Sequence, residues 1–71
     1  MAFIRVTTPY GKKEAVNPFS IKRIEAHAAV RQLVLHFVLA TETMSIVGDL
    51  DSALEVIGKA MGENSGIFEI K

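Results

Sequence analysis

The sequence predicts a small α+β domain: an antiparallel sheet of hairpins, one amphipathic C-terminal helix at about residues 50–61, and a terminal strand. Three observations predict this class. Apolar and polar residues alternate in several short segments, glycine and proline separate these segments, and one segment has the apolar spacing of a helix. We expect residues 1–71 to form a single domain, because no linker, repeat or low-complexity segment divides them.

The N-terminal residues predict a hairpin. Residues 3–7 are rich in β-branched side chains, and their alternation places Ile4 and Val6 on one face of a strand. Residues 8–11 contain a proline, which fixes φ for a turn, and a glycine, which can adopt a positive φ. Residues 13–16 then return as the partner strand.

The segment that follows allows two interpretations, and the first is a long central helix over residues 18–40. Asn17 is a good helix cap, and Pro18 suits the first helical position. No glycine or proline interrupts the chain again until Gly48. On a helical wheel, however, the apolar residues would surround most of the helix, which a chain this short could bury only with partners.

The second interpretation, which we favour, is a pair of strands. Residues 32–39 carry a leucine or phenylalanine at every second position, and a period of two indicates a strand with one buried face. We therefore expect a short 3₁₀ corner at residues 18–20, a strand near 21–26 and a strand near 32–40.

A further short strand at residues 44–47 precedes the predicted helix. Asp49 and Asp51 suit the helix N-terminus, and Gly62 ends the helix. Gly58 weakens it by about 1 kcal/mol relative to alanine unless close packing requires a glycine there. The apolar stripe expected to lie on the sheet comprises Leu50, Ala53, Leu54, Ile57 and Met61.

Residues 67–70 predict a terminal strand. Three of the four are apolar, so a free tail would leave apolar side chains in water. We expect this strand to pair with a sheet edge, either in the same subunit or in another.

The small size and apolar composition predict a homo-oligomer. Hydrophobic residues make up 49% of the chain and the mean hydropathy is +0.29, while a core of this size is expected to supply only about 3 to 5 kcal/mol. Cysteine is absent, and two histidines nine positions apart form no close metal pair, so we expect no metal and no cofactor. The helix stripe is one candidate contact element. The other candidate interface residues are Leu33, Leu35, Phe37, Leu39, Ile67, Phe68 and Ile70.

The net charge is zero, but the charges are unevenly distributed. Residues 1–31 carry six basic and two acidic side chains, and residues 32–71 carry two basic and six acidic ones. The halves either form separate basic and acidic surfaces or interleave so that the charges mix, and we favour mixing. Either Tyr10 or Phe19 could stack on a base. The candidate residues for binding a phosphate or another anion are Arg5, Tyr10, Lys12, Lys13, Lys22, Arg23 and Arg31.

Catalytic patterns are lacking. No nucleophile elbow, phosphate-binding loop or acid-base constellation is recognisable, so we expect a protein that is not an enzyme. The chain has no apolar run of about 20 residues and no recognisable secretory signal, which predicts a cytoplasmic protein with no membrane contact.

The chain resembles the FlbD-like small proteins, a family associated with flagellar and swarming motility that has uncharacterised phage relatives. The resemblance rests on Ile4-x-Val6-Thr7 followed by Gly11-Lys12, on Val16-Asn17 followed by Ile21-x-x-Ile24-Glu25, and on a β segment before the helix at 50–61. It implies a non-catalytic accessory protein that acts by binding.

Together these observations predict a small non-enzymatic binding or regulatory module that acts through protein–protein association. We expect a homo-oligomer with a protein partner, in a bacterial or phage accessory role. One alternative is an oligomeric binder of a nucleotide or another small anionic ligand. A further alternative is nucleic-acid binding through the basic N-terminal half.

Overall fold

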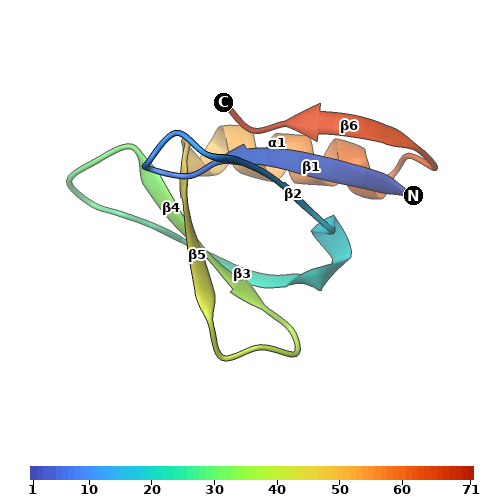
Figure 1. Ribbon diagram of the computed structural model, residues 1–71. Coiled ribbons are helices and arrows are strands. Elements are labelled where there is room, and N and C mark those ends of the chain that lie inside the picture. The colour runs from blue at the N-terminus through green and yellow to red at the C-terminus, as the bar shows by residue number, and fades with distance from the viewer.

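The computed structural model describes residues 1–71 and confirms the α+β class, with one C-terminal helix and two small sheets (Figure 1). The elements in order are β1 (Ala2–Thr7), β2 (Lys13–Val16), the 3₁₀ turn η1 (Pro18–Ser20), β3 (Ile21–Ala26), β4 (Gln32–Phe37), β5 (Thr43–Val47), α1 (Leu50–Met61) and β6 (Gly66–Glu69). One three-stranded sheet has the order β2-β1-β6, and the other has the order β3-β4-β5. The strands thus form two sheets rather than the single sheet expected from the sequence.

The alternative of a long helix over residues 18–40 is wrong. Asn17 caps only η1, where its Oδ1 accepts a hydrogen bond from the backbone N–H of Phe19 at 3.0 Å. The Ser20 hydroxyl donates to the Asn17 carbonyl oxygen at 2.7 Å, and the chain leaves the turn in an extended conformation. Asn17 therefore acts as a cap, as its sequence position predicted, but the element that it caps is the short 3₁₀ turn at the corner between the two sheets.

The first sheet is built around β1. On one side β1 pairs antiparallel with β2, with Ile4 opposite Val16, and on the other it pairs parallel with β6, with Phe3 opposite Ile67. A parallel neighbour requires a long connection, and the chain between the two strands includes the helix α1 just before β6. The terminal strand thus finds its edge in the same chain.

The second sheet is an antiparallel meander of β3, β4 and β5. β4 lies in its centre, with Leu35 opposite Ile24 on one side and opposite Met44 on the other. A register shift in β3 between Ile21 and Arg23 marks a bulge at Lys22. β4 ends at Phe37, short of the predicted boundary at residue 40, because the chain turns there toward β5.

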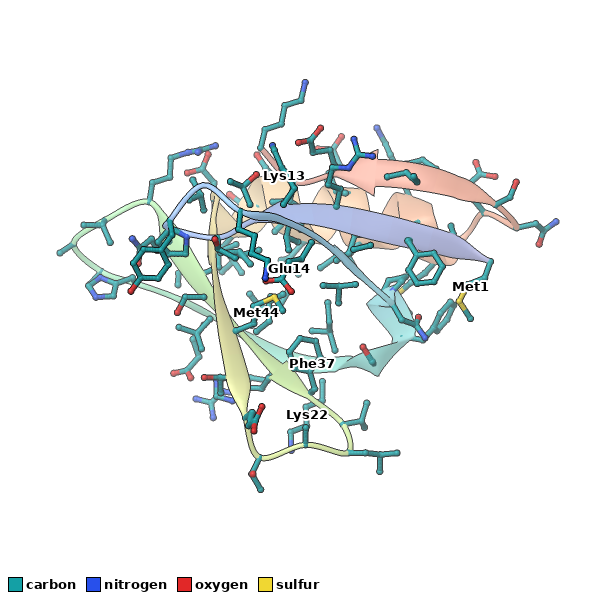
Figure 2. All side chains as sticks on the ribbon, viewed as in Figure 1. Met1, Lys13, Glu14, Lys22, Phe37 and Met44 are labelled. Carbon is teal, nitrogen blue, oxygen red and sulfur yellow. The ribbon has the colours of Figure 1, made fainter.

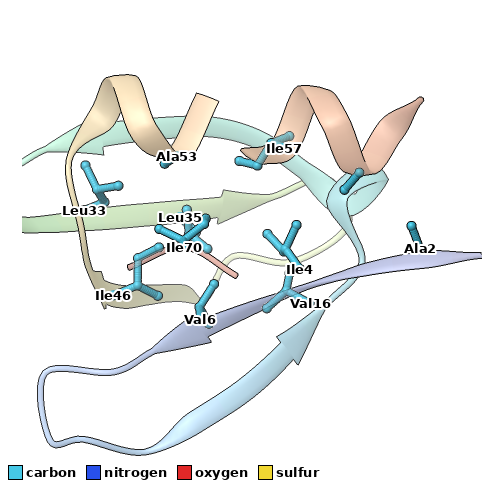
Figure 3. Close-up of a cluster of buried hydrophobic side chains, with 11 residues drawn as sticks. Ala2, Ile4, Val6, Val16, Leu33, Leu35, Ile46, Ala53, Ile57 and Ile70 are labelled. Carbon is cyan, nitrogen blue, oxygen red and sulfur yellow. The ribbon is translucent and has the colours of Figure 1, made fainter. Parts of the chain in front are cut away.

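The core lies between the two sheets and the helix, and Figure 3 shows side chains from all three converging. The first sheet contributes Ile4 and Val6 from β1, both 0% exposed, which confirms the predicted inward face. The second sheet contributes alternate residues of β4, as its period of two predicted. The core cluster of buried hydrophobic residues consists of Ala2, Ile4, Val6, Val16, Leu33, Leu35, Ile46, Ala53, Ile57, Ala60 and Ile70.

The helix buries fewer residues against the core than the width of its apolar stripe predicted. Its buried residues are Ala53, Ile57 and Ala60, whereas Leu54 is 52% exposed and Met61 is 44% exposed. Two of the three buried positions are alanines, so the helix axis lies close to the strands that it covers. The larger side chains on one flank of the stripe are consequently left facing solvent.

Gly48 connects β5 to the helix in a conformation that suits glycine. Its φ is +153°, and a Cβ added there would lie 3.0 Å from the Cγ2 atom of Ile70. Ile70 is fully buried, so Gly48 gives the end of the chain room to enter the core. Gly58 differs, because a Cβ there would meet no atom within 4 Å.

Leu35 in β4 and Leu39 just after it allow the effect of a core substitution to be compared with that of a surface substitution. Leu35 is 0% exposed, so Leu35→Ala should destabilise the fold by about 2 to 5 kcal/mol and leave much of the protein unfolded. Leu39 is 101% exposed, so Leu39→Ala should change the free energy of unfolding by less than about 0.5 kcal/mol. Urea denaturation monitored by circular dichroism measures both effects, and similar losses in the two variants would contradict this core assignment.

Two glycine-to-alanine substitutions should change the free energy of unfolding in opposite directions. Gly58→Ala should raise the free energy of unfolding by about 0.5 to 1 kcal/mol, because alanine favours the helix and has free space at this position. Gly48→Ala should lower the free energy of unfolding, because the new methyl group would press on Ile70 and the backbone would be strained. Thermal and urea unfolding of both variants provide the measurement. If both variants were more stable than the wild type, the packing around Gly48 would be looser than described.

Candidate functional site

Exposed apolar side chains gather around the corner between the sheets. Ten large hydrophobic residues of the chain are exposed, and half of them belong to one region. We call this region the Phe19 surface, and define it by the exposed residues Phe19, Val38, Leu39, Leu54 and Met61. Phe19 is 58% exposed and lines two hollows, one on each side of η1, so the apolar surface is continuous across it.

The first hollow lies between α1 and β3 and has a volume of about 390 Å³. Its apolar lining consists of the uncovered flank of the helix and the residues facing it across the gap. Leu54 and Met61 come from the helix, and Ile21 and Ile24 come from β3. The hollow exists because the helix packs through its alanine line and leaves these larger side chains beside it.

The second hollow lies beside the turn between β4 and β5 and has a volume of about 560 Å³. The Val38 N–H donates a hydrogen bond to the Ser20 carbonyl oxygen at 2.8 Å, which ties the start of this turn to η1. Leu39 follows and is fully exposed, and Phe37 is only partly covered. The turn therefore presents apolar side chains at a position that is anchored by the backbone.

The charged residues that line the two hollows of the Phe19 surface are all basic. Neither hollow is lined by a carboxylate, and the only charged lining residues are Lys22 and Arg23. Arg23 contacts Glu25 on the same strand at 3.2 Å, and that pair is well exposed. Lys22 belongs to no ion pair of the chain, so a positive charge is free at the edge of the apolar surface.

The structure separates the predicted interface residues into two groups. Leu33, Leu35 and Ile70 are core residues, 1% exposed or less, so their prediction as interface residues is wrong. Their apolar alternation reflected burial inside this chain. The other four keep some exposure: Phe37 and Leu39 line the second hollow, and Ile67 and Phe68 lie on β6.

The seven residues proposed for anion binding do not converge. Figure 2 shows Lys13 beside the first sheet and Lys22 near the far end of the second. Arg31 contacts Asp49 at 3.3 Å and donates a hydrogen bond to the Lys71 carbonyl oxygen, so it serves the fold. The full set is distributed over β1 (Arg5), the first turn (Tyr10 and Lys12), β2 (Lys13), β3 (Lys22 and Arg23) and the loop before β4 (Arg31).

A third hollow of about 590 Å³ separates the first hairpin from β5. It contains Tyr10 and Lys12, which the sequence suggested for anion binding, but also the carboxylate of Glu14. Glu14 and Met44 lie near each other on its two sides (Figure 2). One base and one acid give this hollow no preference for an anion.

Charges from the two halves of the chain mix, as expected. Lys13 from the basic half contacts Glu69 from the acidic half, with 2.7 Å between Nζ and Oε2. This hydrogen bond holds the pKa of Glu69 below its ordinary value of 4.5, and the nearby charges of Arg5 and Lys71 act in the same direction. Together with the Arg31–Asp49 contact, it shows that the halves do not form separate charged faces.

The histidines are arranged as structural residues. His36 is hydrogen-bonded through Nε2 to Glu25 on the neighbouring strand, and His27 accepts a hydrogen bond from the Ala29 N–H at 3.2 Å within its own turn. No three side chains of the histidine, cysteine, aspartate and glutamate types are grouped to hold a metal ion. No helix combines the length and apolarity needed to cross a bilayer.

The sequence anticipated the Phe19 surface only in part. Val38 was not predicted as a site residue, Phe19 was considered only for stacking on a base, and Leu54 and Met61 were included only through the helix stripe. The sequence signal for them was the width of the helix stripe, which exceeds what one sheet face can cover. A phenylalanine placed directly after the helix-starting proline was a second, weaker signal, because short corners seldom bury such a side chain.

No family model, curated protein or solved structure matches this chain. The resemblance to the FlbD-like proteins is therefore a prediction that rests on the sequence patterns alone.

Removal of the Lys13 amine should raise the pKa of Glu69. In Lys13→Met the hydrogen bond and the adjacent charge are lost, so the pKa should move up toward its ordinary value. Arg5→Met should cause a smaller rise, because that residue acts only through its charge. Carboxyl NMR titration measures the pKa in each variant.

The same pair predicts the direction of a pH effect. A carboxylate whose pKa is lowered by folding stabilises the native state above its unfolded pKa, and this contribution is lost as the pH falls through the folded value. The wild type should therefore lose more stability than Lys13→Met between about pH 5 and the folded pKa of Glu69. Identical pH profiles would show that the pair forms only transiently in solution.

Proposed function

We propose that this chain is a non-enzymatic, cytoplasmic binding module that acts by docking a partner protein onto the Phe19 surface, as a homo-oligomer in a bacterial or phage accessory role. The observation that supports it is the continuous apolar surface formed by two adjoining hollows, with no carboxylate in either lining. Contiguous apolar surface on a small protein is typical of a site that another molecule covers.

The chemistry of the surface favours an apolar segment that carries acidic side chains. Phe19 and Leu39 offer large apolar contacts of the kind that dominate binding energy. Lys22 and Arg23 stand at the edge of the first hollow, where acidic groups of a partner would be attracted and basic groups repelled. The first hollow runs beside a helix and suits the side chains of an amphipathic segment.

The anionic-ligand and nucleic-acid alternatives have less support. A phosphate site requires several cationic or N–H groups that point at one place, and the basic residues of this chain lie on different elements. Three of them, Lys13, Arg23 and Arg31, already contact carboxylates of the same chain. A ligand would have to compete with those contacts.

A peptide-library selection tests the proposal and defines the chemistry of the segment that binds. Wild-type protein is the bait and the empty support is used for counter-selection, while Leu54→Glu, a change at a 52%-exposed helix position, is kept for the affinity measurements. We expect enriched peptides to combine apolar residues with aspartate or glutamate. Their affinity should fall at least tenfold for Phe19→Ser and Leu54→Glu, because each variant removes a large contact from the surface.

Val30→Asp is the matched control. Val30 is 50% exposed but lies in the turn before β4, away from the two hollows. It should bind the selected peptides as the wild type does, and circular dichroism should confirm that all variants are folded. Enrichment of basic peptides, or peptides that bind Leu54→Glu as well as the wild type, would rule out the Phe19 surface as the docking site.

A further inference from the structure

Four strands form the outer edges of the two sheets, and β5 is the only one of them without a charge or a bulge. β3 carries a bulge and the charges of Lys22 and Arg23, β2 begins with a lysine and a glutamate, and β6 ends with Glu69. Charges and bulges of this kind keep an edge from pairing with another chain. β5 (Thr43–Val47) has neither a charge, a proline nor a bulge along its five residues.

The hydrogen-bond pattern determines which backbone groups of β5 face outward. The Gly48 N–H donates to the Arg31 carbonyl oxygen at 3.1 Å, and these residues are opposite each other when the β4–β5 register is continued by one step. Antiparallel strands alternate between hydrogen-bonded and non-hydrogen-bonded pairs. Met44 and Ile46 therefore direct their backbone groups toward β4. The groups of Thr43, Ser45 and Val47 point toward the open edge.

We propose that a second copy of this chain pairs with β5 through an antiparallel arrangement with a two-fold axis at Ser45, which joins the two β3-β4-β5 sheets into one. Ser45 then lies opposite Ser45 of the second copy, and Thr43 lies opposite its Val47. All three of these residues have outward-facing N–H and C=O groups, so each opposing pair is of the hydrogen-bonded type. The strand is thus complementary to itself about its central residue.

Side-chain faces match in this arrangement. Met44 lies opposite Ile46 of the second copy, and both positions are on the core side of the sheet, since Met44 is paired with Leu35 and Ile46 with Leu33. The small serine occupies the axis on the other face, where it is exposed. A shift by one residue would lose this agreement, because it would oppose residues with outward-facing and inward-facing backbone groups.

A hollow also lies beside the edge of β5, between this strand and the first hairpin. The hollow of about 590 Å³ adjoins Met44 and Ser45 and separates them from the first hairpin. Edge pairing uses backbone groups of β5, whereas the Phe19 surface is formed by η1, the β4–β5 turn and α1. The inference rests on the homo-oligomer of the proposed function and specifies its interface, but it is independent of docking at the Phe19 surface, and a dimer formed in this way keeps two copies of that surface.

A single cysteine at the axis tests the arrangement. The chain has no cysteine, so Ser45→Cys introduces the only thiol. Opposing residues in a hydrogen-bonded antiparallel pair have Cβ atoms about 5.5 Å apart, which is too far for an unstrained disulfide but within the reach of a short bismaleimide crosslinker. With a short bismaleimide and the protein at micromolar concentration, Ser45→Cys should form a covalent dimer at least ten times faster than Ser65→Cys, whose cysteine lies in the exposed loop before β6.

A charge at the axis provides the second measurement. Ser45→Lys brings two like charges together across the two-fold axis, while the exposed side chain leaves the monomer fold intact. By light scattering, we expect a dimer for the wild type and for Phe19→Ser, and a folded monomer for Ser45→Lys. A monomeric wild type, equal rates of crosslinking in the two cysteine variants, or a dimer lost in Phe19→Ser and kept in Ser45→Lys would each overturn the inference.

Discussion

The return of the C-terminal strand to β1 is the interaction on which the rest of this structure depends. β1 is the only strand of its sheet with a neighbour on each side, and it also contacts α1 and β5. When β6 pairs beside it, the Ile70 N–H donates to the Arg5 carbonyl oxygen at 2.9 Å, and the Ile70 side chain enters the centre of the core. Because the chain has no disulfide, its two ends are held together by this strand pairing and by the packing that it permits.

Two residues far apart in the sequence make that return fit. Gly48 leaves out the side-chain atom that would collide with Ile70, and Arg31 binds both Asp49 and the carbonyl oxygen of Lys71. The connection from β5 to the helix and the end of the chain are therefore fixed at the same place. The helix then lies where its alanines can approach the strands closely, and its larger apolar residues are displaced to the flank. The exposed Phe19 surface is thus a consequence of how the core closes.

The sequence predicted those structural elements whose formation depends on residues that are neighbours in the chain. The corner after Asn17, the strand at residues 21–26 and the helix at 50–61 all have local signals, and the structure places them with those bounds. The parallel pairing of β1 with β6 could not be predicted, because no local pattern distinguishes it from an antiparallel pairing. For the same reason the sequence assigned Leu35 and Leu39 to one apolar row, although β4 ends between them and only Leu35 is buried. The site was the least predictable part, since its residues come from three elements whose packing brings them together.

Composition alone indicated that the chain carries more apolar surface than it can bury, and the structure shows where the excess lies. The chain is 49% hydrophobic, yet only 11 hydrophobic residues are buried, so most of its apolar side chains keep contact with solvent. Apolar excess that was spread evenly over the surface would carry no functional meaning. Here, half of the exposed large residues share one surface whose only charges are basic, while the one uncharged sheet edge lies elsewhere. A side-chain surface selects a partner by shape and charge, whereas a bare strand edge offers backbone groups that a copy of the same strand can match. The two features therefore favour different occupants, and a protein this small has room for both because they use different elements.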